Sequence, residues 1–183
     1  MIQRILFATD FSEGAGGAQR LAVSWTKQWR ARLDILHVLE LPPAISLENP
    51  PHRMYVDALR QQADRRLGEL REHLVQDGIH PNVRVEVGLP SRAIEEIARE
   101  LNADLLVLGT HGRTGLDHLL IGSTAERVVR TAPCPVLTVR TPKQGEVEAG
   151  LPAASLSVDR DILVPVDFSD CSLDALEYAV QVA

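Results

Sequence analysis

One segment of the sequence, residues 109–124, combines four glycines with serine and threonine hydroxyls: GTHGRTGLDHLLIGST. Glycine lets a backbone approach a ligand without obstruction by a Cβ atom, or adopt a positive φ. Gly122, Ser123 and Thr124 stand at the start of an expected helix, where N–H groups and the macrodipole favour an anion. The chemistry that this pattern predicts is the binding of phosphate groups by backbone amides.

Two widespread phosphate-binding motifs are absent. The pattern GxxxxGK[ST] does not occur, and the GxGxxG pattern that begins at Gly14 fails at Gln19. The glycines of residues 109–122 could also form only a turn between a strand and a helix. A turn needs one or two glycines, however, whereas this segment contains four. We therefore favour a nucleotide phosphate cradle over a purely structural loop.

Alternating strands and helices must position this segment. Apolar runs predict strands at 2–9, 33–39, 83–87, 103–109 and 136–140. Helical spacing predicts helices from the N-cap Ser12 to about Arg32, and at 54–76, 90–101 and 123–131, with a proline-rich loop at 41–52. The order βαβαβαβαβ predicts an α/β fold, a doubly wound five-stranded parallel sheet with helices on both faces, as in Rossmann-like proteins.

The ends of the first and fourth strands are expected to share one crevice. Ligands of open parallel sheets bind beyond the carboxyl ends of the strands, where the strand order reverses. Asp10 ends the first strand and Gly109 the fourth, so both would face that crevice. Asp10 could also cap the helix that follows it, because Asp167 repeats it where no complete pocket is expected. The two roles are compatible.

Composition excludes several classes of function. The 25 acidic and 19 basic side chains give a net charge of −6, which argues against binding to a nucleic-acid backbone. No apolar stretch approaches the roughly 18 residues of a membrane span. Two distant cysteines suggest neither a disulfide framework nor a metal site. We expect a cytoplasmic protein without nucleic-acid or membrane partners.

The beginning of the sequence recurs near its end. Residues 160–169, RDILVPVDFS, match residues 3–12, QRILFATDFS, at an offset of 157 positions. This predicts a domain at 1–140, a linker at 141–159 and an incomplete second repeat, one strand and one helix, at 160–183. The strand expected at 162–166 would expose an edge, so we expect it to pack on a neighbouring chain or on the first domain, or to belong to a shortened tandem protein.

The spacing of Gly109, Gly112, Gly122 and Ser123 resembles the ATP-binding signature of the universal stress protein family. Further similarity lies in ILFATDFS at 5–12, in His37-Val38, and in AERVVRTAPCPVL at 125–137. The resemblance covers about residues 1–140, with a second start at 160–183.

This resemblance implies a site for ATP with Mg²⁺. Ala8 and Thr9 would lie beside the base, which Val38 would meet through its backbone. Asp10 would lie near the ribose or a metal-bound water, and Leu108 and Gly109 beside the sugar. The phosphates would be held by Gly112, Gly122, Ser123 and Thr124, with His111 and Arg113 as further candidate contacts. Relatives of this type commonly form homodimers through the fifth strand, here Pro135 to Arg140, and act in stress survival.

Catalysis is not expected. Asp10 and Asp117 form no evident acid–base pair or metal cluster, so we predict no catalytic residue and slow hydrolysis at most. His37 is expected to be a satisfied core histidine, and Trp25 and Trp29 to pack in a core or interface. We predict a nucleotide-responsive binding protein. The alternatives are an adenylate-handling enzyme, such as an ATP pyrophosphatase or adenylyl transferase, and a dimerising domain without nucleotide.

Overall fold

The computed structural model describes residues 2–42, 44–45, 48–110, 121–140 and 162–182. The predicted contacts His111, Gly112 and Arg113, together with Asp117 and the expected linker, lie outside these residues. Contacts divide the chain into two units, Ile2–Glu146 and one that contains Val147–Ala183.

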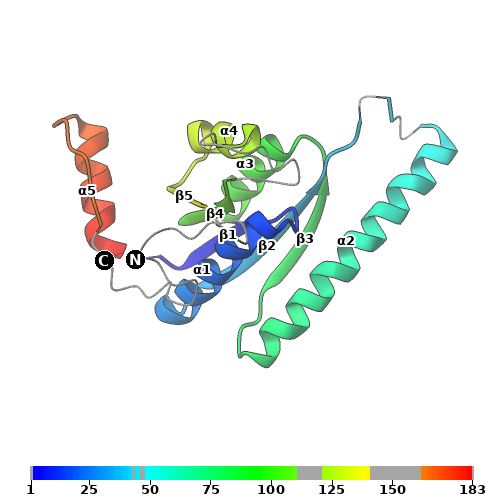
Figure 1. Cartoon of the computed structure of the whole chain (residues 1–183), viewed down its shortest axis with the longest axis horizontal. Helices are drawn as coiled ribbons and strands as arrows, with labels where there is room; N and C mark the ends of the chain where they lie inside the picture. The colour runs from blue at the N-terminus through cyan, green and yellow to red at the C-terminus, as the bar shows by residue number, and fades with distance from the viewer. Residues whose placement is uncertain (1, 43, 46–47, 111–120, 141–161, 183) are drawn as a thin grey trace, which may run out of the picture. The chain divides into compact units, whose positions relative to one another are not determined.

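The first unit contains one parallel sheet in the strand order β3-β2-β1-β4-β5 (Figure 1). Its strands are β1 (Arg4–Ala8), β2 (Arg32–Leu39), β3 (Asn82–Val87), β4 (Leu105–Gly109) and β5 (Val136–Val139). Its helices are α1 (Glu13–Trp29), α2 (Pro50–Gln76), α3 (Pro90–Leu101) and α4 (Ser123–Thr131). Helices α1 and α2 lie on one face of the sheet, and α3 and α4 on the other (Figure 1). The predicted doubly wound α/β fold is confirmed.

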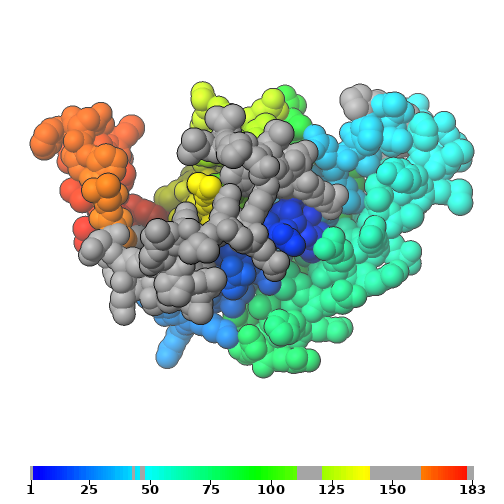
Figure 2. Space-filling model, viewed as in Figure 1, coloured from blue at the N-terminus to red at the C-terminus, as the bar shows by residue number. Residues whose placement is uncertain are grey.

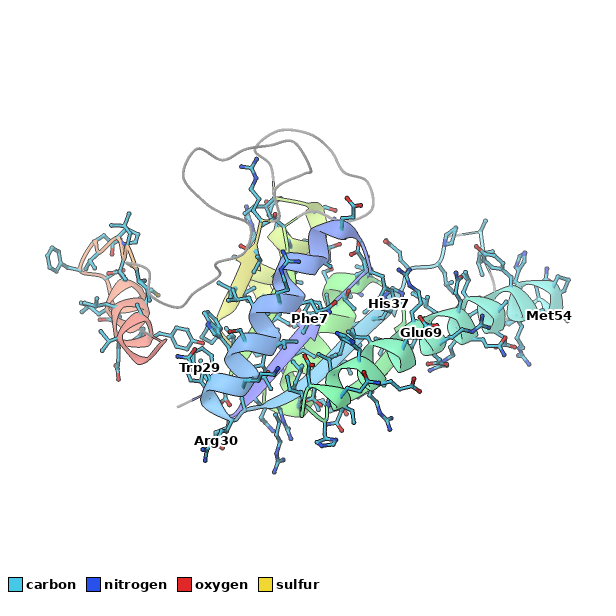
Figure 3. All side chains as sticks on the ribbon, turned by 60° about the horizontal axis from the view of Figure 1, so that its bottom comes forward. Phe7, Trp29, Arg30, His37, Met54 and Glu69 are labelled. Atoms are coloured by element: carbon cyan, nitrogen blue, oxygen red, sulfur yellow. The ribbon has the colours of Figure 1, made fainter. Side chains whose placement is uncertain are left out.

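The core is built from strands that are buried on both faces. Ile5, Leu6 and Phe7 of β1 are at most 1% exposed, and β1 lies between β2 and β4. Because successive side chains of a strand point to opposite faces, the central strands must be apolar throughout. Figure 3 shows Phe7 in the middle of the sheet. This arrangement holds the carboxyl ends of β1 and β4 next to each other.

The boundaries of two helices differ from prediction. Helix α1 ends at Trp29 because Arg30 adopts a left-handed conformation with φ of 54°, so the predicted end at Arg32 is wrong. Helix α2 begins at Pro50, inside the predicted loop 41–52. Prolines are tolerated in the first turn of a helix, where their missing N–H has no partner to lose. Pro50 and Pro51 therefore start α2 instead of extending the loop.

Helix α2 is longer than the strands that it connects. Its 27 residues span about 40 Å at about 1.5 Å per residue, whereas the eight residues of β2 span about 26 Å. Its first half therefore projects beyond the carboxyl edge of the sheet, with Met54 near the projecting end (Figure 3). In Figure 2 its side chains, cyan to green, form a long ridge on one side of the unit.

The second unit contains helix α5 (Asp170–Val182). The predicted strand at 162–166 does not form, and Leu163 is 92% exposed. A strand needs a neighbour for its backbone hydrogen bonds, and the described residues of this unit include no other strand. No helix within the described parts of the chain has the length and apolar character needed to cross a membrane.

Candidate functional site

A cleft of about 720 Å³ lies at the carboxyl ends of β1, β2 and β4. This volume is typical of sites for small ligands and cofactors. Four separate segments of the chain contribute the predicted site residues that line it: Ala8, Thr9, Asp10, Val38, Leu108, Gly109, Gly122, Ser123 and Thr124. Of the predicted site residues, Gly112 and Arg113 lie outside the described part of the chain. The fold thus brings every described member of the predicted set to one cleft.

The turn between β1 and α1 lines the cleft. Asp10 Oδ1 accepts hydrogen bonds from the Ser12 N–H (3.0 Å) and the Ser12 hydroxyl (2.6 Å). Ser12 is the N-cap of α1, and its Oγ accepts from the Ala15 N–H at 3.3 Å. The interpretation of Asp10 as the helix cap is therefore wrong. Asp10 shapes the turn through Ser12, the residue that caps the helix.

Gly109 has a structural role that the sequence did not reveal. A Cβ atom at this position would lie 2.8 Å from the Gly14 carbonyl oxygen. The missing side chain therefore lets the end of β4 pack against the first turn of α1, whereas the expectation was an approach of backbone to ligand. Close packing of these two backbones fixes the end of β4 relative to the first turn of α1, and both line the cleft.

A backbone hydrogen bond brings the two halves of the glycine-rich segment together. The Gly122 N–H donates to the Thr110 carbonyl oxygen at 2.8 Å, although 12 positions separate the two residues. The Thr110 N–H in turn donates to Val139 of β5 at 3.0 Å. This pairing places the first turn of α4 beside the end of β4.

Helix α4 begins at the cleft with its amide groups available. Its N-cap is Gly122, which provides no side-chain cap. First-turn N–H groups have no acceptor within their own helix, and here Ser123 and Thr124 carry them. Their hydroxyls add further donors at the same point. An anion at this helix start would meet both the amides and the positive end of the macrodipole.

Three side chains in contact with one another, from β2, α2 and the turn after β1, line the cleft. The Arg66 guanidinium lies 4.3 Å from the centre of the Phe11 ring, and the Phe11 and His37 rings are 4.5 Å apart. His37 is only 3% exposed, and its Nδ1 lies 2.7 Å from the Thr9 carbonyl oxygen. Because a carbonyl oxygen only accepts, Nδ1 carries the proton. His37 is a buried, hydrogen-bonded histidine as predicted, and it also lines the cleft.

Helix α2 supplies cleft residues that sequence reasoning missed. They are Tyr55, Leu59, Gln62, Ala63 and Arg66. The available signal was length, because a crossover helix of more than 20 residues must project beyond strands of five to eight residues. Since α2 follows the carboxyl end of β2, its projecting half comes to lie at the ligand-binding edge of the sheet.

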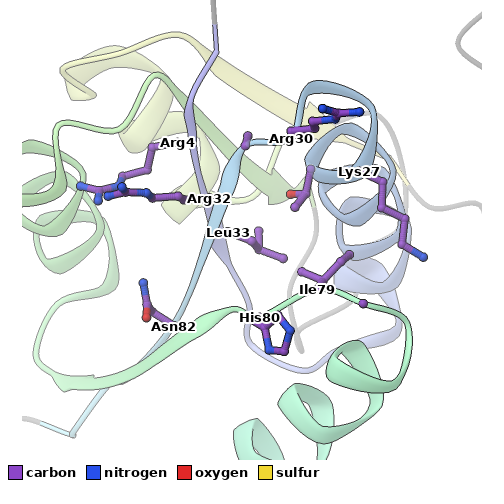
Figure 4. Close-up of a pocket in the computed structure, with 11 residues that line it drawn as sticks. Arg4, Lys27, Arg30, Arg32, Leu33, Ile79, His80 and Asn82 are labelled. Carbon is purple, nitrogen blue, oxygen red and sulfur yellow. The ribbon is translucent and has the colours of Figure 1, made fainter.

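A second hollow, of about 690 Å³, lies at the amino ends of β1, β2 and β3 (Figure 4). Its cationic side chains do not converge, since Arg4 and Arg32 extend to one side of β2 and Lys27 and Arg30 to the other. Arg4 pairs with Asp34 at 3.6 Å, and Lys27 with Asp77 at 3.5 Å. This hollow contains no predicted site residue, so the cleft is the stronger candidate.

A doubly wound parallel sheet with a cleft at its strand-order reversal, next to a helix start, defines a Rossmann-like α/β protein. The family model described as the universal stress protein family matches residues 1–140, and the chain belongs to this family.

Relatives support this assignment. A universal stress protein of Methanocaldococcus jannaschii is 30% identical over 145 residues, which cover 79% of this chain and 85% of that protein. The structure of a universal stress protein from Lactobacillus plantarum is 30% identical, with a TM-score of 0.65 over 76% of this chain and 98% of that one. A universal stress protein in complex with cAMP is 26% identical, with a TM-score of 0.51 over 77% of this chain and 98% of that one.

Proposed function

We propose that this protein binds ATP in the cleft and acts in the cytoplasm as a nucleotide-responsive binding module of the stress response. One observation carries the proposal. Four segments that the sequence resemblance assigns to a nucleotide site, residues 8–10, 38, 108–109 and 122–124, line one cleft of suitable volume. The related protein in complex with cAMP supports an adenine nucleotide as the ligand class.

The amides at the start of α4 would hold the phosphates. Ser123 and Thr124 present N–H groups and hydroxyls there, and the Gly122 N–H is already engaged by Thr110. Val38 would meet the base, and Asp10 the ribose or a water on the metal. Gly112 and Arg113 remain predicted phosphate contacts.

Mg²⁺ would enter the cleft bound to the phosphates. Within the described residues, no group of three or more histidine, cysteine or carboxylate side chains could hold a metal alone. Mg²⁺ commonly combines one or two carboxylates with the phosphates of its nucleotide, and Asp10 lines the cleft as such a carboxylate. The metal would offset phosphate charge, and we propose at most slow hydrolysis.

The test is calorimetric titration of ATP with Mg²⁺ into the wild type and two variants. Ser123→Asp places a carboxylate at the phosphate seat, where the helix dipole stabilises it, so the fold should not suffer. Ser123→Asn is the neutral control of similar shape. We expect saturable binding by the wild type, a loss of about tenfold or more in Ser123→Asp, and a small effect in Ser123→Asn.

Absence of binding by the wild type, or equal affinities of Ser123→Asp and Ser123→Asn, would contradict the proposal. Substitution of Gly122 is a poorer test, because a Cβ atom there would lie 3.0 Å from the Thr110 carbonyl oxygen and disturb the backbone itself. Turnover of ATP above about 1 per second, followed as ADP or pyrophosphate, would favour the alternative of an adenylate-handling enzyme.

We further propose a homodimer through β5, which is an edge strand of the sheet. The carbonyls of Pro135 and Val139 accept hydrogen bonds from the β4 side. Alternation along the strand therefore turns the backbone groups of Thr138 toward the open edge. Thr138→Pro removes an edge donor without breaking the pairing with β4. We expect the wild type to sediment as a dimer and this variant as a monomer.

A further inference from the structure

We propose that Arg66 of α2 determines specificity for nucleotides over nucleosides, by contacting the phosphate groups of a ligand in the cleft. This inference rests on the proposed function, because it assigns a role at the same site. Arg66 follows Ser12, the last residue of the turn after β1, by 54 positions in the sequence. It lies outside every segment of the predicted nucleotide site.

Few of the described side chains that line the cleft carry a full charge. Of the described residues that line it, Asp10 and Glu40 are carboxylates, and Arg66 is the one with an arginine or lysine side chain. A nucleoside triphosphate would bring several negative charges into this cleft. Backbone amides offer partial charges, whereas a guanidinium offers a full charge and paired donors that match phosphate oxygens. Arg66 is therefore the described side chain best suited to balance the ligand.

Arg66 contacts Phe11 through both the ring and the backbone carbonyl of that residue. Its guanidinium rests on the face of Phe11 and donates to the Phe11 carbonyl oxygen at 3.5 Å, the limit of a hydrogen bond. Both contacts are weak at an exposed position, and no ion pair fixes Arg66 among the described residues. A phosphate offers stronger, charge-assisted hydrogen bonds, so the side chain can leave this resting position at little cost.

Through Phe11, Arg66 contacts the turn that leads into α1. Phe11 immediately precedes Ser12, the cap of α1, and the first turn of α1 packs against Gly109 at the end of β4. The turn that begins α1 thus lies between the Arg66 side chain and the strand that leads to the glycine-rich segment. A ligand that extended from Val38 toward Ser123 would pass this turn. Arg66 contacts the same turn from the α2 side.

The experiment compares ATP with adenosine on four proteins: wild type, Arg66→Ala, Arg66→Lys and Arg65→Ala. Arg65 is the exposed neighbour of Arg66 on α2 and does not line the cleft, so it controls for charge and helix propensity. We expect Arg66→Ala to weaken ATP binding by about 10- to 100-fold and to leave adenosine binding unchanged. Arg66→Lys should restore part of the loss, and Arg65→Ala should bind both ligands like the wild type.

Three outcomes would overturn the proposal. Equal losses for ATP and adenosine in Arg66→Ala would show that Arg66 only supports the cleft wall through Phe11. Unchanged ATP affinity would show that the side chain does not meet the phosphates. Binding of neither ligand by the wild type would remove the proposed function itself, whereas binding by the wild type without an effect of Arg66 removes this inference alone.

Discussion

The Asp-Phe-Ser segments at 10–12 and 167–169 adopt the same turn in two different surroundings. In both, the aspartate Oδ1 accepts from the serine N–H at 3.0 Å and from the serine hydroxyl at 2.6 Å. The phenylalanine between them has a φ of 60° in the first and 64° in the second. The serine then caps a helix through a bond of 3.3 Å in each case. Local sequence alone is sufficient to set this turn.

The residues before the two turns behave differently. Leu6 is fully buried in β1, between β2 and β4, whereas the equivalent Leu163 is 92% exposed and lies outside any strand. Their neighbours in sequence are similar. A strand therefore requires partner strands in a way that the turn and its helix do not.

The comparison of the two turns shows which features of residues 10–12 are local and which depend on the candidate site. A positive φ at a phenylalanine would ordinarily suggest strain stored for function. Phe168 shows the same angle in a unit without a described sheet, so the angle of Phe11 is a property of the turn. What distinguishes the first segment is its surroundings, in which Phe11 contacts His37 and Arg66.

The largest expected effect comes from shortening the two equivalent leucines. Leu6→Ala leaves a cavity in the core and should lower the free energy of unfolding by about 2–5 kcal/mol. Leu163→Ala removes an exposed side chain and should change it by less than about 0.5 kcal/mol. Urea unfolding followed by circular dichroism measures both. Similar losses in the two variants would mean that Leu163 is buried in solution, and that the contrast between the segments is smaller than described.

Much of the fold could be predicted from sequence because it depends on local patterns. Continuous apolar runs marked the buried strands, and alternating elements fixed a parallel sheet with β1 beside β4. The described site residues therefore came to one cleft. By contrast, the contact of Gly109 with Gly14 joins positions 95 residues apart, and no local pattern encodes it. The prediction of a strand at 162–166 was wrong for the same reason. Its apolar pattern does not show whether other strands are present to pair with it.

The two free cysteines extend the contrast between buried and exposed positions. Burial, with a smaller contribution from Asp104, raises the pKa of the half-buried Cys134 thiol to about 11, whereas Cys171 is exposed in the first turn of α5. At pH 8 only about one in a thousand Cys134 side chains is then a thiolate, the reactive form. We expect alkylation of Cys134 to be much slower than that of Cys171. Peptide mass spectrometry after timed alkylation measures the two rates.

The pH profile of this reaction sharpens the test. The rate at Cys134 should rise about tenfold for each pH unit between pH 8 and 10, because its thiolate fraction does so below the pKa. The variant Cys171→Ser provides the control in which Cys134 is the remaining thiol. A rate at Cys134 that levels off below pH 10 would contradict the raised pKa.

The smallest expected effect concerns the turn that both segments share. Hydrogen bonds from the Ser169 hydroxyl and N–H, with a further contribution from Ser172, lower the pKa of Asp167 from 3.8 to about 2. Ser169→Ala removes the first of these bonds, so the pKa of Asp167 should rise toward 3.8, as measured by NMR titration of its carboxyl carbon.

Because the folded pKa is the lower one, the bonds stabilise the turn above about pH 4, and this contribution disappears as the pH falls toward 2. In Ser169→Ala the helicity of α5 should therefore depend less on pH across this window. An unchanged pKa of Asp167 in the variant would mean that the turn is held by its backbone alone, and the likeness of the two segments would then not depend on their serines.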